Sequence, residues 1–165
     1  MRLACWQPCM AKRHWLFKSE PEAFSIDDLA KAKDQTTFWD GIRNYQARNL
    51  LRDEIQSGDL VLFYHSNANP AAVVGTATVV KQAQPDPTQF NPASTKHDPK
   101  ATKDDPRWYG VDIQFVSKFK HPVTLDTIKN SPQLGDMVLV KRSRLSIQPV
   151  HVKEFERIVK MGAKP

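Results

Sequence analysis

Residues 60–65 have the sequence LVLFYH, from Leu60 to His65, and this run is apolar on both alternating faces. A run of that kind is typical of a strand in the interior of a sheet. Residues 67–70 then predict a turn, and residues 72–80 (AVVGTATVV) predict a second strand. Together the two segments predict a pair of antiparallel strands joined by a short connection.

Further strands are predicted on both sides of this pair in the sequence. Residues 14–18 (HWLFK) form an aromatic and aliphatic run that ends at turn residues. Residues 108–116 (WYGVDIQFV) alternate between apolar and polar side chains, as a half-buried strand does. Residues 137–140 predict a short strand. Residues 37–41 predict a loop with two aromatic side chains, and residues 84–107 predict a long loop, because no periodicity is present there.

Helical patterns lie between these strands. Ser25 and Asp28 have the spacing of a capping box, with Asp in place of Glu, and predict a short helix. Residues 44–56 carry apolar side chains at helical spacing, with Gly58 as the predicted C-terminal cap. Residues 124–130 and 151–161 predict two more helices. Because strands and helices do not alternate regularly, the pattern favours an α+β fold, a small and mostly antiparallel β-barrel decorated by helices.

The length and composition describe one basic globular domain. The chain has 165 residues, and we expect one domain over residues 14–161 and a tail over residues 162–165. Residues 1–13 are expected to be an N-terminal extension, which a misassigned start would explain. Lys and Arg number 24 against 18 Asp and Glu, a net charge of +6 that attracts polyanions, of which nucleic acid is the commonest. No run is apolar enough for a membrane span or a signal peptide, so we expect a soluble, cytoplasmic protein, or a nuclear one in a eukaryote.

The sequence carries no recognisable catalytic or metal-binding signature. The cysteines, Cys5 and Cys9, are predicted to be free thiols, and no second Cys pair completes a zinc site. Tyr64, His65 and Ser66 form the most enzyme-like cluster, but strand alternation sends His65 to the face opposite Ser66. We therefore predict a protein without catalytic residues, cofactor or metal.

Aromatic and cationic side chains gather instead in one loop-to-helix stretch, where Trp39, Asn44, Tyr45 and Arg48 fall close together. Aromatic faces stack on bases, and an asparagine amide offers the donors and the acceptor that a base edge requires. Arginines pair with phosphates or base edges. Taken alone, each residue also has an ordinary structural interpretation. The tryptophan could pack in the core, and the arginine could lie on the solvated surface.

The chain also resembles a known family. Residues 15–21 (WLFKSEP), 39–49 (WDGIRNYQARN) and 63–67 (FYHSN) are similar to motifs of the EVE domain family, and Val74-Gly75, residues 107–112 and residues 143–146 continue the pattern. The resemblance spans residues 15–158, with Ile42 where many members have Val. The family is PUA-like, related in fold to YTH and SRA domains, and is associated with recognition of modified cytosine in DNA.

The resemblance implies a pocket at the barrel mouth that holds a single, often modified, base. The residues that it places around the base are Lys18, Ser19, Trp39, Asn44, Tyr45, His65, Ser66 and Trp108. The residues expected at the phosphate backbone are Arg43, Arg48, Lys141, Arg142, Arg144 and Ser146. The predicted partner is nucleic acid, DNA in preference to RNA, and no membrane. The alternatives are a nuclease or RNA-modifying enzyme like the ASCH relatives, with Lys18, Tyr64 or His65 as acid or base, and an RNA-binding or interaction module.

Overall fold

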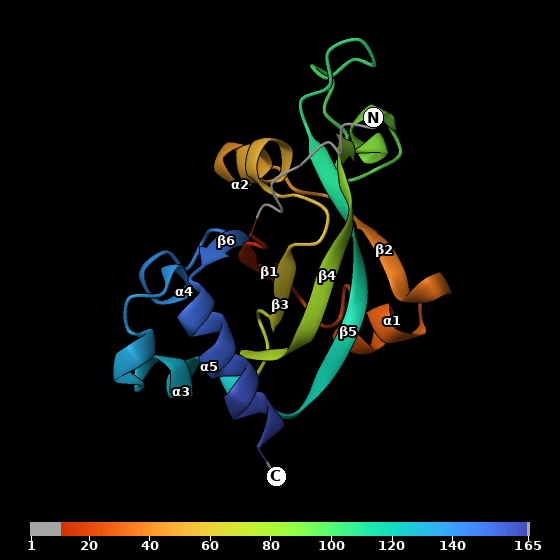
Figure 1. Ribbon diagram of the computed structural model, residues 1–165. Helices are drawn as coiled ribbons and strands as arrows, with labels where there is room; N and C mark the ends of the chain where they lie inside the picture. Colours follow the sequence, from red (N-terminus) through yellow and green to blue (C-terminus); the bar gives the residue numbers. More distant parts are fainter. Residues whose placement is uncertain (1–10, 165) are drawn as a thin grey trace, which may run out of the picture.

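A computed structural model describes residues 11–164, so Cys5, Cys9 and most of the predicted extension lie outside the described residues. Its centre is a six-stranded sheet in the order β2-β5-β4-β3-β1-β6 (Figure 1). The strands are β1 (His14–Ser19), β2 (Thr36–Trp39), β3 (Leu60–His65), β4 (Ala72–Pro85), β5 (Tyr109–Thr124) and β6 (Ile147–Val150).

The sheet is mixed and open. β1 and β3 are parallel, and the other neighbouring pairs are antiparallel, including the predicted pair β3–β4. The register between β4 and β5 shifts at several points, and such bulges bend a sheet. Within residues 11–164 the edge strands β2 and β6 pair with their single neighbours and not with each other, so the barrel-like sheet is not closed. The predicted α+β, mostly antiparallel architecture is confirmed, with an open sheet in place of a closed barrel.

The helices are short, apart from the last. They are α1 (Ile26–Lys31), α2 (Tyr45–Asn49), α3 (Leu125–Lys129), α4 (Val138–Lys141) and α5 (Val152–Ala163). A π-helical turn, Leu50–Glu54, continues α2, and 3-10 turns lie at Lys33–Gln35, Pro87–Phe90 and Pro132–Leu134. The predicted capping box is present at the start of α1, where Ser25 accepts from the Asp28 amide and the Asp28 carboxylate accepts from the Ser25 amide.

Three local predictions were wrong. The predicted loop at residues 37–41 is in its first part strand β2, which pairs with β5 and is too short to show alternation. The predicted strand at residues 137–140 is instead largely helix α4, since a short apolar run fits either structure. Gly58 caps no helix: the helical turns end at Glu54, and Gly58 lies in the turn before β3, with φ at 94°.

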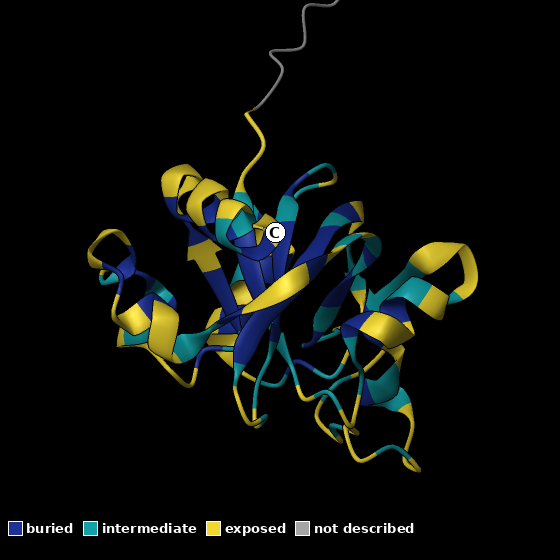
Figure 2. Ribbon diagram, turned by 90° about the horizontal axis from the view of Figure 1, so that it is seen from below, coloured by how far each residue is buried: buried dark blue, intermediate teal, exposed yellow. Residues whose placement is uncertain are grey.

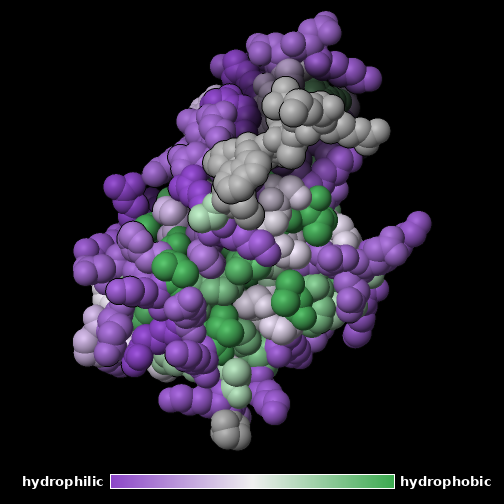
Figure 3. Space-filling view, in the orientation of Figure 1, coloured by the Kyte–Doolittle hydropathy of each residue, from purple (hydrophilic) through white to green (hydrophobic). Residues whose placement is uncertain are grey.

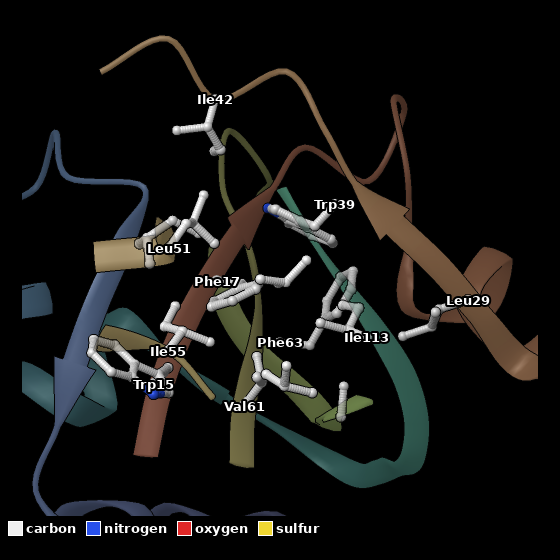
Figure 4. Packing of buried hydrophobic residues seen from close by; sticks show 14 of the residues in the cluster. Trp15, Phe17, Leu29, Trp39, Ile42, Leu51, Ile55, Val61, Phe63 and Ile113 are labelled. Carbon is white, nitrogen blue, oxygen red and sulfur yellow. The ribbon is translucent and has the colours of Figure 1, made fainter. Parts of the chain in front are cut away.

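The core lies on both faces of the sheet, as the apolar interior strands predict. Along β1, Trp15 and Phe17 enter one cluster with residues from α1 and α2, while Leu16 enters a second cluster with residues from α3, α4 and α5. Figure 2 shows the buried strands in the middle and the exposed sides of the helices around them. The first cluster, shown in Figure 4, reaches the ends of β1 and β2, where it meets the candidate site.

Candidate functional site

A cavity opens where β1 and β2 end. It has a volume of about 660 Å³, within the range of ligand-binding clefts. Polar and aromatic side chains share its lining. Of the residues expected around a base, the cavity brings together Lys18, Ser19, Trp39, Asn44 and Ser66, and it also includes Arg43 and Ser146.

Trp39 is an aromatic wall of the cavity and at the same time a core residue. Its exposed fraction is 8%, and its ring lies 5.4 Å from that of Phe17 and 5.5 Å from that of Phe63. Phe24, which also lines the cavity, meets the tryptophan ring edge-on at 6.4 Å. Figure 4 shows Trp39 on the margin of the cluster, between Phe63 and Ile42. The indole is thus held by packing, with little freedom to move.

Asn44 is the N-cap of α2. Its Oδ1 accepts a hydrogen bond from the Ala47 amide at 3.0 Å, so this acceptor holds the first turn of the helix. An asparagine amide also carries two N–H donors, and these stay available at the exposed position 44. The residue therefore offers donors to the cavity, while the acceptor function expected of it is largely committed to the helix.

The end of β1 is tied to the turn formed by residues 143–146. The Lys18 amide donates to the Ser146 carbonyl, and its Nζ donates to the Ser143 carbonyl. Burial lowers the pKa of Lys18, whose ammonium lies 5.7 Å from the Tyr64 ring centre. The Ser19 hydroxyl donates to the Phe24 carbonyl at 2.7 Å, which leaves its oxygen lone pairs for another partner.

His65, Tyr45 and Trp108 do not line this cavity. His65 faces α1, where its Nε2 accepts a hydrogen bond from the Ile26 amide at 3.1 Å. Burial lowers the pKa of His65 and so favours the neutral form, which this hydrogen bond requires. Tyr45 and Trp108 form a separate stack, with ring centres 4.9 Å apart. Trp108 is buried and its Nε1 donates to Asp98, while Tyr45 is half exposed.

Two of the expected phosphate-binding arginines are engaged inside the protein. Arg43 pairs with the fully buried carboxylate of Asp86 at 2.9 Å and donates to the Lys96 carbonyl. Arg48 donates to the Arg107 carbonyl and lies over the Tyr45 ring. These guanidinium groups are therefore structural ties between α2, the segment before it and the long loop.

The basic turn of residues 141–146 adjoins the cavity. A second hollow of about 350 Å³ is lined by Asn44, Gln46 and residues 141–145, so Asn44 borders both hollows. Lys141 pairs with Asp136 at 2.8 Å. Arg142 and Arg144 are exposed, and neither takes part in an ion pair within residues 11–164. Their guanidinium groups therefore stay predicted phosphate contacts.

Three charged residues of the cavity wall, Glu20, Asp40 and Lys96, were not among the predicted site residues. Partial desolvation and the neighbouring Asp86 carboxylate raise the pKa of Asp40. The resemblance to EVE motifs covered Asp40, but nothing in its spacing marked it as functional. Lys96 lies in the long loop, where no periodic pattern exists to give it a position; only the length of that loop hinted at a function.

Residues 11–164 hold no group of three or more His, Cys, Asp or Glu side chains placed to bind a metal ion. Among the same residues, no helix is both long and apolar enough to cross a membrane.

Comparison with known proteins identifies the family. The family model of the EVE domain matches residues 13–161. The chain belongs to the EVE domain family. Human thymocyte nuclear protein 1 is 42% identical over 168 residues, which cover 92% of this chain and 74% of the human protein.

Solved structures of similar proteins agree with this EVE fold. Human THYN1, in a crystal structure in complex with 5-methylcytosine containing DNA, superposes with a TM-score of 0.88 at 42% identity, covering 93% of this chain and 99% of the other. A hypothetical protein from Leishmania major gives a TM-score of 0.87 at 46% identity, covering 92% and 94%. The ASCH protein of Zymomonas mobilis, at 10% identity and a TM-score of 0.53, shares the fold alone.

Proposed function

We propose that this EVE domain binds DNA without acting on it chemically and takes a modified cytosine into the cavity beside Trp39. The observation that carries the proposal is a cavity with an aromatic wall, a hydrogen-bond acceptor and amide donors, in a chain 42% identical to a protein seen with 5-methylcytosine DNA. The relatives named thymocyte nuclear protein suggest that a eukaryotic form acts in the nucleus.

The proposed contacts match the chemistry of the base. A flipped base loses a few kcal/mol of stacking, and stacking on an aromatic side chain returns about 1–3 kcal/mol. Cytosine presents an amino donor at N4 and acceptors at N3 and O2, which suit the Asp40 carboxylate and the Asn44 amide. A 5-methyl group is apolar and suits the side chains of Phe24 and Ile42, which also line the cavity.

An enzymatic role has less support from the same residues. His65 accepts a backbone hydrogen bond, and Tyr64 is 3% exposed with its pKa raised by burial. Lys18 donates to a backbone carbonyl. Each candidate acid or base is thus engaged or enclosed, so we favour binding over catalysis.

Fluorescence polarisation with matched oligonucleotides tests the base preference. We expect the wild-type protein to bind a 5-methylcytosine duplex about tenfold more tightly than the cytosine duplex, since one methyl group in an apolar pocket is worth about 1–3 kcal/mol. Asn44→Ser keeps an acceptor for the Ala47 amide but removes the amide donors, so it should weaken binding to the modified duplex about tenfold without unfolding the protein. Equal binding of all duplexes by the wild type would refute the proposal.

Asp40 gives a sharper test, because thymine also carries a 5-methyl group but has a carbonyl where cytosine has its amino group. Asp40→Ala removes the acceptor for that amino group and should reduce the preference for 5-methylcytosine over thymine by about 1–3 kcal/mol. Loss of a negative charge should meanwhile strengthen binding to DNA in general. The measurement is the ratio of the two dissociation constants at fixed salt.

Asp104→Ala is the matched control for charge, because Asp104 is exposed and does not line the cavity. It should strengthen general binding and leave the preference unchanged. If both variants behave alike, Asp40 acts only through its charge.

A further inference from the structure

We propose that Lys96 is a further nucleotide-binding residue, which contacts the phosphate beside the base held in the cavity, and that Arg43 positions it. The inference rests on the proposed function, because it needs a base in the cavity. It assigns a role to the long loop of residues 86–107, which projects beyond the ends of β4 and β5 (Figure 1). In Figure 3 that projecting end is covered mainly by hydrophilic side chains.

The root of the loop is fixed to the cavity wall through Asp86. This carboxylate is fully buried and accepts from the Gly41 amide at 2.8 Å, from Arg43 at 2.9 Å and from the Thr88 hydroxyl at 2.6 Å. Gln89, also fully buried, donates to the Asp86 and Trp108 carbonyls and accepts from the Trp108 amide. The wall and the start of the loop are therefore one hydrogen-bonded unit.

Arg43 extends this unit to Lys96. Its Nε and one terminal nitrogen donate to the Lys96 carbonyl at 2.9 and 2.7 Å, while the other terminal nitrogen binds Asp86. A guanidinium is planar and rigid, so it sets the distance and the direction between the two partners. The backbone of Lys96 is thus held beside the cavity although it lies in a loop.

The Lys96 side chain then runs along the cavity rim. Its Cγ, Cδ and Cε lie 3.4–3.8 Å from the point where a Cβ would stand on Gly41, whose φ is 77°. Both residues line the cavity. A Cβ at position 41 would meet the lysine stem at ordinary van der Waals distance, but the positive φ would strain a residue other than glycine there.

The ammonium at the end of this stem is available to a ligand. None of the ion pairs formed within residues 11–164 includes Lys96. The Asp40 carboxylate lines the same cavity, and its negative charge attracts positive charge to the rim. When a base enters the cavity, its sugar and phosphate stay at the mouth, where Lys96 offers a cation on the loop side, in addition to Arg142 and Arg144 on the turn.

The test compares Lys96→Ala with Lys103→Ala, an exposed lysine of the same loop that does not line the cavity. Lys96→Ala should weaken binding to the 5-methylcytosine duplex about tenfold, as loss of a charge-assisted contact does. It should also reduce the slope of log K against log salt by about 0.9, the value for one phosphate. Both effects should be clearly smaller with the unmodified duplex, because fewer bases then occupy the cavity.

Arg43→Lys tests the positioning role, since lysine keeps the charge beside Asp86 but cannot hold the Lys96 carbonyl with two donors. The loss of affinity should be similar to that of Lys96→Ala, and the double variant should bind no more weakly than Lys96→Ala alone. Additive losses would mean that Arg43 acts through stability or through its own contact, and would overturn the positioning role. Thermal unfolding of each variant shows whether it is folded at the temperature of the binding measurement.

The outcomes separate this inference from the proposed function. If the wild type prefers 5-methylcytosine and Lys96→Ala behaves like Lys103→Ala, the role of Lys96 is wrong and the proposed function stands. If Lys96→Ala weakens both duplexes equally, Lys96 belongs to the general basic surface and the inference is again wrong. A wild type without base preference overturns both.

Discussion

Replacing Asp86 with asparagine is expected to lower the free energy of unfolding by about 3–5 kcal/mol, the range for breaking a buried ion pair by removing one partner. The carboxylate is fully buried and accepts hydrogen bonds from Arg43, Gly41 and Thr88. Asparagine has nearly the same shape but brings N–H donors to a place where the neighbours are donors too. Urea unfolding at neutral pH measures the loss.

The effect should depend on pH. Burial by itself would raise the pKa of Asp86, but hydrogen bonds from Thr88, Gly41 and Arg43 outweigh it and hold the pKa below its ordinary value. A carboxyl with a lowered folded-state pKa stabilises the protein above its unfolded-state pKa, close to 3.8, and loses that contribution as the pH falls through the folded-state pKa. The difference between wild type and Asp86→Asn should therefore be largest near neutral pH and shrink in acid.

Asp104→Asn supplies the control, because this exposed carboxylate lies in the same loop and takes part in no ion pair within residues 11–164. It should change the unfolding free energy by less than about 0.5 kcal/mol. A loss below about 1 kcal/mol for Asp86→Asn, or a difference that grows in acid, would mean that Asp86 does not hold the start of the loop as described.

Trp39→Ala is expected to have the second large effect, lowering the unfolding free energy by about 3–5 kcal/mol. The ring packs against Phe17, Phe24 and Phe63, so its loss leaves a void in the core as well as removing a cavity wall. Binding to the 5-methylcytosine duplex should also fall more than tenfold, since a stacked aromatic is worth about 1–3 kcal/mol.

Because the alanine variant combines these two losses, Trp39→Phe separates them. Phenylalanine fills more of the space and keeps an aromatic face, so most of the stability and a measurable base preference should return. Unfolding and polarisation measurements on both variants give the two effects independently. If Trp39→Ala unfolds as easily as expected but a folded sample keeps full base preference, the indole is only a core residue.

The main features of the fold could be predicted from local patterns, and the exceptions share a physical cause. Strand β3 and the capping box of α1 carry signals that are complete within a few residues. β2 and α4 have four residues each, too few for a periodicity of two to be told from one of 3.6. Their structures depend on partners distant in sequence, such as β5 for β2.

The site could be predicted only in part for a related reason. Motif resemblance located the cavity residues Lys18, Ser19, Trp39 and Asn44, since these lie on or beside regular elements. It could not tell that Arg43 turns inward, because an arginine that binds a phosphate and one that binds a buried carboxylate look the same in a sequence. The deciding partner, Asp86, lies in another segment.

The N-cap at Asn44 limits how this site can be changed in evolution or by design. Helix N-caps favour Asn, Asp, Ser, Thr and Gly, and substitution by other residues weakens the helix by about 1 kcal/mol. Of these residues, only asparagine carries amide N–H donors. The start of α2 and the supply of donors to the cavity thus together require asparagine at position 44. Substitution of Asp40 at the rim is therefore the easier way to alter the base preference.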